Sequence, residues 1–455
     1  MPSNLIYLVM NNFLQTTTPT LLAIVLVTLG LSSCDNPTSQ EASEETPAAL
    51  SADTDNGSII LPDGFAALLV ADEVGKARHI VVRDNGDLYV KLKSTDNGGG
   101  ILALRDTTGD GRADLKEYFT DYAGSGIDIY NDYLYFSTDT SVYRVKLNAD
   151  ELVPTDEPEL VVGGFLSQPQ HEAKSFTFDN DGHLYVTVGA PSNACQEKLR
   201  TPGSPGQDPC PQLELQGGIW QFSANQTNQT QEKDGTRYAI GIRNGFALDW
   251  NDSVDQLYAL QHGRDQLATL WPEYYTNEQS AELPAEEFLR VDDGDDFGWP
   301  YCYYDPSQEK KLLAPEYGGN GQEIGRCEDK EQPIMTFPAH WAPNDLVFYQ
   351  GDMFPDQYQQ GAFIAFHGSW NRAPLPQQGY MVAFVPFGND GLPSGEFERF
   401  ADQFAGSGEE IETPNGAEYR PTGLAIGPDG SLYISDDTTG RIWRVFYEGS
   451  PVAME

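Results

Sequence analysis

The hydrophobic positions of this chain recur as short apolar and aromatic strands, each preceded by a turn. The clearest copy is Asp429-Gly430-Ser431-Leu432-Tyr433-Ile434, in which a tight-turn dipeptide leads into a strand. Degraded copies of this pattern recur along the sequence. The copies are centred on Leu88-Tyr89, Leu134-Tyr135, Leu184-Tyr185, Leu257-Tyr258, Phe363-Ile364 and Leu432-Tyr433. A unit repeated in this way predicts an all-β fold, a six-bladed β-propeller of four-stranded antiparallel blades with one copy in each blade.

The two ends of the repeat region predict how the propeller closes. Strand-like residues 58–61 and 65–70 precede the first complete copy, and residues 442–447 end the last one. A propeller must protect its open seam, because unpaired strand edges invite association with other chains. We therefore expect a strand from the N-terminal side to pair with the last blade.

The spacing of the copies is uneven. Successive copies are separated by 46, 50, 73, 106 and 69 residues, whereas a four-stranded blade needs about 40 to 50. The excess falls in segments 190–236 and 266–345. Insertions in repeat proteins lie in loops on one face, often the binding face, so these segments are candidates for function.

The N-terminal residues predict export. Residues 1–33 form a signal peptide of the lipoprotein type, with an apolar stretch over residues 21–31 that is too short to span a bilayer. Leu31-Ser32-Ser33-Cys34 resembles the bacterial lipobox, which implies lipidation of Cys34. The alternative is an ordinary cleaved secretory signal with an incidental cysteine. We expect an exported bacterial protein, a periplasmic or cell-surface lipoprotein that contacts the membrane only through its lipid anchor.

Composition divides the rest of the chain in two. Residues 34–58 contain few large apolar side chains and predict a flexible acidic tether, followed by a propeller domain over residues 59–450. The formal net charge is −42. This charge argues against nucleic-acid binding, because neutralising phosphates requires clustered cations.

Four cysteines remain after Cys34, as expected for disulfides in an exported protein. Proximity in sequence favours the pairs Cys195–Cys210 and Cys302–Cys327. A zinc site is the alternative, but the chain has no Cys-x-x-Cys spacing to support it.

Polar and cationic residues occur beside successive strands, where blades converge on the propeller axis. The residues are His171, Lys174, Arg243, Asn244, His262, Gly263, Arg264, the run His367-Gly368-Ser369-Trp370-Asn371-Arg372, and Arg420. Such a ring suits a planar polyanion whose carboxylates are held by Arg and Lys.

These motifs carry a family resemblance. The chain is similar to the soluble sugar dehydrogenases that depend on pyrroloquinoline quinone (PQQ), a family that includes soluble aldose dehydrogenases, and most of all to the sorbosone dehydrogenase-like subgroup. The resemblance covers residues 61–447. It is carried by Ser192-Asn193-Ala194-Cys195, Gly298-Trp299-Pro300-Tyr301-Cys302, Phe337-Pro338-Ala339-His340 and the run from His367 to Arg372.

The resemblance implies a role for two catalytic residues. His171 matches the general base that takes a proton from the sugar hydroxyl while hydride passes to the quinone. Arg243 matches the residue that stabilises charge on the quinone oxygen.

Further matches concern the cofactor and its Ca²⁺. The implied cofactor contacts are Lys174, Asn244, His262, Trp370, Asn371, Arg372 and Arg420. The backbone carbonyls of Gly263 and Arg264 match those that hold the calcium. The chain departs from soluble glucose dehydrogenases at Thr422, where they carry a second arginine, and at His262, where they carry glutamine.

A second calcium site is indicated by an acidic run near residue 110. Asp106, Thr108, Asp110, Asp114 and Glu117 follow the spacing of a calcium-binding loop, with Thr108 in place of Asp or Asn. The flanking segments have the pattern of strands rather than helices. A structural Ca²⁺ and a plain acidic turn therefore stay open alternatives.

Together these features predict an oxidoreductase that oxidises an aldose or a related sugar aldehyde with PQQ and Ca²⁺. Electrons would pass to a separate acceptor, a cytochrome or a quinone, because the chain has no Cys-x-x-Cys-His haem motif. One alternative is a propeller lactonase or related hydrolase, which needs an axial metal held by Glu, Asn and Asp. The other is a noncatalytic binding propeller.

Overall fold

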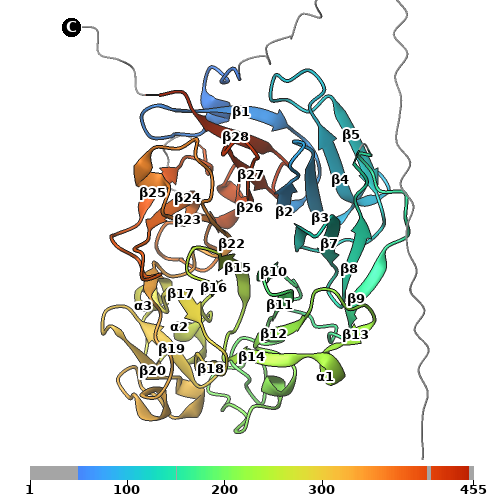
Figure 1. The fold of residues 1–455 in the computed structure, drawn as a ribbon. Helices are drawn as coiled ribbons and strands as arrows, with labels where there is room; N and C mark the ends of the chain where they lie inside the picture. Colours follow the sequence, from blue (N-terminus) through green and yellow to red (C-terminus); the bar gives the residue numbers. More distant parts are fainter. Residues whose placement is uncertain (1–49, 150, 407–410, 450–455) are drawn as a thin grey trace, which may run out of the picture. The chain divides into compact units, whose positions relative to one another are not determined.

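A computed structural model describes residues 50–149, 151–406 and 411–449. The predicted signal peptide, Cys34 and residues 34–49 of the tether lie outside this part. Six sheets of the described residues form the predicted propeller (Figure 1). The first blade contains β2 (Ala77–Val82), β3 (Leu88–Asp96), β4 (Gly99–Arg105) and β5 (Leu115–Phe119), and the second contains β6 (Ile127–Tyr130), β7 (Tyr133–Ser137), β8 (Val142–Lys146) and β9 (Glu159–Gly163). The third contains β10 (Phe176–Phe178), β11 (His183–Val188), β12 (Gly218–Ser223) and β14 (Thr236–Ile240), and the fourth contains β15 (Gly245–Asn251), β16 (Gln256–Gln261), β17 (Glu286–Val291) and β21 (Met335–Phe337). The fifth contains β22 (Pro343–Phe348), β23 (Gly361–His367), β24 (Tyr380–Pro386) and β25 (Glu398–Ala401), and the last contains β26 (Pro421–Ile426), β27 (Leu432–Asp436), β28 (Ile442–Tyr447) and β1 (Phe65–Ala71).

The first strands of the blades close a ring around the axis. β2 contacts β6 and β26, β10 contacts β6 and β15, and β22 contacts β15 and β26. Strands within each blade pair antiparallel, as predicted. Two blades differ from four strands, because β13 (Gln229–Thr230) adds parallel to β9 and β18 (Asp295–Asp296) adds parallel to β14.

All six predicted sequence copies lie in the second strand of a blade and are buried. The tyrosines of three copies link neighbouring blades, which explains why the pattern is aromatic and polar at once there. The Tyr89 hydroxyl donates to the Leu152 carbonyl at 2.9 Å, Tyr135 donates to Ala224 at 2.9 Å, and Tyr258 donates to Gly391 at 2.6 Å. Each of these hydroxyls reaches a carbonyl of the following blade, so it joins adjacent sheets and satisfies a buried polar group.

Closure follows the prediction, because β1 pairs antiparallel with β28 as the outer strand of the last blade. The preceding residues protect its outer edge. The backbone amide of Ala67 donates to Asn56 Oδ1 at 3.0 Å, and the amide of Leu69 donates to Asp53 Oδ2 at 2.7 Å. The predicted tether extended to Ser58, but Asp53 and Asn56 are bound to the propeller because their side chains satisfy edge amides. The anchored region therefore begins earlier than composition indicated.

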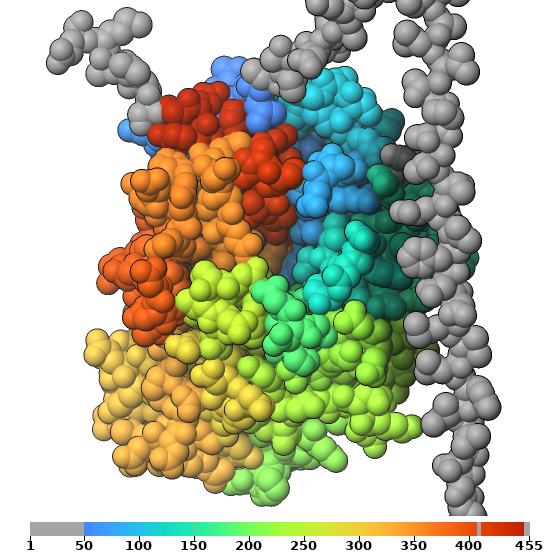
Figure 2. Space-filling model, viewed as in Figure 1, coloured from blue at the N-terminus to red at the C-terminus, as the bar shows by residue number. Residues whose placement is uncertain are grey.

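The long intervals hold most of the remaining elements. The remaining elements in the long intervals are α1 (Gln231–Asp234), α2 (Leu267–Leu270), α3 (Asn277–Glu282), the hairpin of β19 (Cys302–Asp305) and β20 (Lys310–Leu313), and the 3₁₀ turns η2 (Pro211–Glu214), η3 (Pro315–Tyr317), η4 (Gly325–Cys327), η5 (Asp356–Tyr358) and η6 (Pro414–Gly416). The 3₁₀ turn η1 (Asn56–Ser58) precedes the first blade. Residues 266–345 gather in one block, yellow to pale orange in Figure 2. Both predicted disulfides are formed, Cys195–Cys210 and Cys302–Cys327. No helix among the described residues is long and apolar enough to cross a membrane.

Candidate functional site

A cavity of about 780 Å³ opens at one end of the propeller axis. Each blade contributes to it through residues just before or at the start of its first strand, because these backbones converge there. Contributing residues include Arg78, Ser125, His171, Asn244, Asn344 and Arg420. The ends of the second strands add His262, His367 and Asp437. We call this space the axial cavity.

The axial cavity gathers cations in a chain whose net charge is −42. Lys76, Arg78, Lys93 and Arg420 line it, against the carboxylates of Asp139, Glu172 and Asp437. Asp437 is already engaged, because it lies 2.8 Å from His367 Nε2 and 3.3 Å from Arg78 Nη1. The local surplus of positive charge favours an anionic ligand.

Two arginines that line the axial cavity have a buried donor without a partner. The Nε atoms of Arg78 and Arg420 make no hydrogen bond within the described structure. A buried unpaired donor costs about 1–3 kcal/mol. Two such donors on one cavity wall fit an acceptor-rich ligand such as a polycarboxylate, and this geometry supports the predicted fit to PQQ.

His171 lies at the wall of the axial cavity with its ring orientation fixed. Its Nδ1 lies 2.6 Å from the Ala190 carbonyl oxygen, so Nδ1 carries the proton and donates. Nε2 is therefore left as the acceptor. The Gln168 side-chain amide donates to the His171 carbonyl at 2.8 Å and to the Gly189 carbonyl at 3.0 Å, which holds the segment in place.

Burial, followed by the nearby Arg243 guanidinium, holds the pKa of His171 well below 6.5. The imidazole is consequently neutral at neutral pH. A neutral ring with a fixed Nδ1 proton and an unprotonated Nε2 has the properties that a general base requires.

Arg243 adjoins His171 and is buried in a network of acceptors. Its Nη1 donates to the Gly263 carbonyl at 2.8 Å, and its Nη2 donates to Asp265 Oδ2 at 2.9 Å and to Asn193 Oδ1 at 3.0 Å. Arg243 helps to hold the pKa of Asp265 at about 2, against the opposing effect of burial. Sequence reasoning missed Asn193, although it lies within the motif at residues 192–195, and Asp265, which directly follows Arg264.

Asn244 and His262 form a second fixed pair on the cavity wall. The Asn244 amide lies 3.1 Å from His262 Nδ1, and His262 Nε2 lies 2.9 Å from the Pro343 carbonyl. His262 Nε2 therefore carries the proton, and Nδ1 accepts from Asn244. Burial lowers the pKa of His262 to about 4.

Of the remaining predicted cofactor contacts, Trp370 and Arg420 line the axial cavity. Trp370 is 55% exposed, and the Arg420 guanidinium lies 4.4 Å from the centre of its ring. Asn371 donates to Asp265 Oδ1 at 2.9 Å. Thr422, the departure from glucose dehydrogenases, is buried and donates to the Arg420 carbonyl at 3.0 Å.

Lys174 and Arg372 have other surroundings. Lys174 is buried and donates to the Glu172 carbonyl at 2.6 Å, and burial lowers its pKa to about 8. Arg372 donates to the carbonyls of Ala281, Ala339 and Pro376, and it lines a different cavity. The structure therefore does not bring Arg372 to the axial cavity, because its guanidinium is held by these backbone carbonyls.

The predicted calcium ligands are the backbone carbonyls of Gly263 and Arg264. The Gly263 carbonyl accepts from Arg243 at 2.8 Å. The Arg264 side chain, which is not part of that prediction, pairs with Glu316 at 2.5 Å. Within the described residues, no group of three or more His, Cys, Asp or Glu side chains is placed to hold a metal. A calcium ion at the two carbonyls stays a prediction.

The acidic run near residue 110 forms a hydrogen-bonded turn. Asp106 accepts from the backbone amides of Thr108, Gly109 and Gly111 at 3.0, 2.7 and 2.7 Å, and Asp114 accepts from the amide of Thr107 at 2.8 Å. Asp110 accepts from the Arg112 amide, and Glu117 lies on β5. These bonds use carboxylate oxygens that a calcium ion would need, which favours the alternative of a plain acidic turn.

Sequence reasoning also missed the cations of the first blade. Lys76 and Arg78 flank the start of β2, the position that Arg243 and Arg420 occupy near β15 and β26. A search for a cation at the start of the first strand of every blade would have identified Lys76 and Arg78.

Comparison of the chain with known proteins finds a matching family and several related sequences. Residues 59–448 match the model of a family described as TrAA12-like. A PQQ-dependent sugar dehydrogenase of Hypocrea jecorina is 22% identical over 93% of this chain and 95% of its own length. A PQQ-dependent pyranose dehydrogenase of Coprinopsis cinerea is 26% identical over 48% of this chain and 31% of its own length.

A solved structure has the same fold. The holo form of the PQQ domain of the Coprinopsis cinerea pyranose dehydrogenase matches with a TM-score of 0.68 and 19% identity, over 85% of this chain and 97% of that domain. The matched stretch spans less than half the length of three curated relatives.

Proposed function

The chain belongs to the TrAA12-like family, and on this premise we propose that it is a PQQ-dependent sugar dehydrogenase that oxidises an aldose or a related sugar aldehyde. The observation that carries the proposal is the axial cavity, in which a base-competent His171 faces a space lined by Lys76, Arg78, Lys93 and Arg420. The names of the relatives support the same chemistry.

The cofactor is assigned to the cationic wall. Arg78 and Arg420 would hold carboxylates through their unpaired Nε donors, and the exposed face of Trp370 would cover the planar ring system. When bound, PQQ supplies a quinone that accepts hydride from the sugar carbon.

His171 receives the hydroxyl proton of the sugar at Nε2. Its Nδ1–H continues to donate to the Ala190 carbonyl, so the ring cannot rotate without losing that hydrogen bond. Arg243 is held by Asp265 and Asn193, and its fixed charge stabilises negative charge that develops beside it.

Calcium is part of the proposal on the basis of the family resemblance alone. The Gly263 carbonyl is engaged with Arg243, so we assign no step to the metal. The lactonase alternative requires an axial metal held by Glu, Asn and Asp, whereas the axial cavity is lined by the cations Lys76, Arg78, Lys93 and Arg420. The noncatalytic alternative has no supporting observation of its own.

Export is the further part of the proposal. Two disulfides within the propeller support an oxidising compartment. We propose an exported lipoprotein anchored at Cys34, with electrons passing to a separate cytochrome or quinone. Globomycin-sensitive processing and labelling with a radioactive fatty acid, lost in Cys34→Ala, would test the anchor.

The function is tested by mixing the purified protein with PQQ, with and without Ca²⁺, and following cofactor binding by fluorescence. Reduction of an artificial dye is then measured with a panel of aldoses. We expect binding, and we expect dye reduction with at least one sugar. His171→Ala should keep cofactor binding and lose about 10²–10⁴-fold in turnover. Absence of both binding and dye reduction would refute the proposal.

A further inference from the structure

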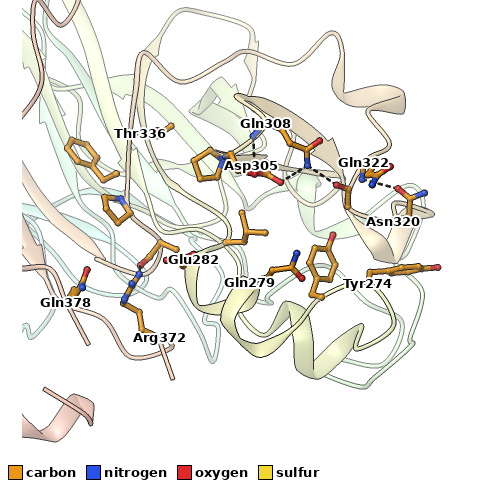
Figure 3. A pocket seen from close by; sticks show the side chains of 18 residues that line it. Tyr274, Gln279, Glu282, Asp305, Gln308, Asn320, Gln322, Thr336, Arg372 and Gln378 are labelled. Carbon is orange, nitrogen blue, oxygen red and sulfur yellow. Dashed lines mark hydrogen bonds between the residues drawn. The ribbon is translucent and has the colours of Figure 1, made fainter. Parts of the chain in front are cut away.

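A second cavity, of about 850 Å³, lies away from the propeller axis (Figure 3). It is built by the insertion in the fourth blade. Its walls come from α3, the β19–β20 hairpin, the loop at Asn320–Gln322 and the residues after β21. We call it the side cavity. Its lining differs chemically from that of the axial cavity.

Carboxamide side chains dominate the polar lining of the side cavity. Gln279, Gln308, Asn320, Gln322 and Gln378 all contribute, and Figure 3 shows them spread around its rim. The side chains of Gln322 and Gln378 make no hydrogen bond with the described residues. Carboxamides both donate and accept hydrogen bonds, so this lining can bind a hydroxyl group either as a donor or as an acceptor.

Two more of these carboxamides keep an unused donor. Gln279 Oε1 accepts from the Thr276 amide at 2.9 Å, which fixes the side chain and leaves its Nε2 free. Asn320 Oδ1 accepts from the amides of Gln322 and Glu323 at 3.0 and 3.1 Å, which leaves its Nδ2 free. The donors are thus held in position before any ligand arrives, which lowers the entropy cost of binding.

An aromatic platform stands at the edge of the side cavity. Tyr274 is 44% exposed and stacks on Trp271 with an interplanar angle of 18°. Tyr275 lies deeper and shares a hydrogen bond of 2.7 Å with Tyr303. An exposed ring backed by a second ring offers an apolar face beside polar groups, which suits a ligand with both C–H and O–H surfaces.

Three charged groups line the side cavity, Arg372, Asp305 and Glu282. The Arg372 guanidinium donates to three backbone carbonyls, and Glu282 acts on it electrostatically. Asp305 accepts from Ser307 Oγ at 2.6 Å and from Gln308 Nε2 at 2.8 Å. Because the single cation of the lining is bound to backbone carbonyls and two carboxylates accompany it, the side cavity does not favour anions such as nucleotides. Its uncharged polar groups suit a neutral polyhydroxyl compound.

The walls of the side cavity are also braced. The Cys302–Cys327 disulfide encloses the stretch that contains Asp305, Gln308, Asn320 and Gln322. A crosslink of this kind restricts the loops that carry the binding groups. The side cavity is therefore a preorganised feature of the insertion.

We propose that the side cavity binds a neutral oligosaccharide, with sugar rings stacked on Tyr274 and hydroxyl groups bound by the carboxamides. The loop after β23 joins the two sites, because its Trp370 lines the axial cavity whereas its Arg372 and Gln378 line the side cavity. The assignment of the oligosaccharide as the substrate whose end is oxidised in the axial cavity rests on the proposed function. The binding site itself does not.

Isothermal titration of the full chain without added cofactor tests the site. The probes are cellotetraose, maltotetraose and laminaritetraose, each up to about 10 mM, near the weak limit of specific binding. We expect at least one to bind. Tyr274→Ala should weaken binding about 10-fold or more, a loss of about 1.4 kcal/mol. Gln322→Ala should also weaken it, whereas Gln226→Ala, an exposed glutamine in another loop, should not.

Absence of binding by all three tetrasaccharides would overturn the proposal, and so would binding that Tyr274→Ala leaves unchanged. Thermal midpoints of the variants establish that they are folded. His171→Ala should keep tetrasaccharide binding, and Tyr274→Ala should keep PQQ binding. A chain that binds a tetrasaccharide but no PQQ would refute the proposed function alone, so the two failures are distinguishable.

Discussion

His171 Nδ1 lies 2.6 Å from the carbonyl oxygen of Ala190. This contact sets the tautomer of the ring, because a carbonyl can only accept, and it directs the unprotonated Nε2 to substrate. The segment is irregular, since His171 has a φ of 52°. Left-handed backbone at a non-glycine residue costs about 1–3 kcal/mol and persists only where the surroundings impose it.

The pH profile should report the depressed pKa of His171. Since burial and Arg243 hold this pKa well below 6.5, the ring stays unprotonated as pH falls through 6.5. The acid limb of kcat/KM should therefore lie below that value. Arg243→Met removes a positive charge near His171 and one of the two arginine partners of Asp265, so both effects should raise the pKa of His171 and shift the limb toward higher pH. An unshifted limb would show that another group is the base.

Gly189→Ala should displace the base. A Cβ at Gly189 would lie 2.6 Å from both the Cβ and the carbonyl oxygen of His171, whereas Asn244 Oδ1 on the cavity wall would be at an ordinary contact distance of 3.4 Å. The His171 segment would have to move, and a misplacement of about 1 Å can cost about 10²-fold in rate. We expect kcat to fall at least 10-fold with PQQ affinity retained.

Gly163→Ala is the matched control for that substitution, because its Cβ would meet Leu160 at an ordinary 3.5 Å. Its kcat should equal that of the wild type. Equal activity in Gly189→Ala would contradict the role assigned to the position of His171.

Arg420→Gln should weaken PQQ binding. Arg420 has an unpaired buried Nε and lies 4.4 Å from the centre of the Trp370 ring at the cavity wall. Loss of a buried charge pair with a ligand carboxylate costs about 2–5 kcal/mol, equivalent to about 30-fold or more in Kd. Fluorescence titration measures it. Arg399→Gln, on the exposed outer strand of the fifth blade, should leave Kd unchanged.

The pH dependence of stability should report the carboxylate of Asp128, a half-buried residue on β6, the first strand of the second blade. Burial raises the pKa of Asp128 from 3.8 to about 7. The folded state therefore holds a proton that the unfolded state has released, so this group lowers stability as pH rises from about 4 to about 7. Asp128→Asn removes that dependence, and the amide oxygen can still accept from Ile129.

The thermal midpoint of Asp128→Asn relative to wild type should therefore increase between pH 4 and pH 7. Parallel curves for the two proteins across this range would contradict the raised pKa.

Sequence predicted the scaffold well, because turn chemistry and strand periodicity are local properties. The Leu-Tyr copies place the second strand of every blade, and both cysteine pairs were found from proximity. Arg372 shows the limit of such reasoning. It follows Trp370 by two residues, yet its guanidinium is captured by the carbonyls of Ala281 and Ala339, and no local pattern encodes those distant contacts.

The same limit applies to the carboxylates. The spacing of Asp106 and Asp114 left a calcium site and a plain acidic turn as alternatives, and the hydrogen bonds of their oxygens to backbone amides favour the turn. Conversely, Asp265 is a central partner of Arg243 that the sequence did not distinguish from other acidic residues. Whether a carboxylate binds a metal, an amide or an arginine depends on folded geometry.

The most direct test of the central claim is an anaerobic single-turnover experiment. The protein is reconstituted with PQQ and mixed with one equivalent of an aldose that supports dye reduction, while the cofactor spectrum is followed by stopped flow. We predict complete reduction of the bound cofactor in the wild type and, in His171→Ala, the same cofactor binding with reduction slowed about 10²–10⁴-fold. A bound cofactor that stays oxidised in the wild type, or that His171→Ala reduces at the same rate, would contradict the account.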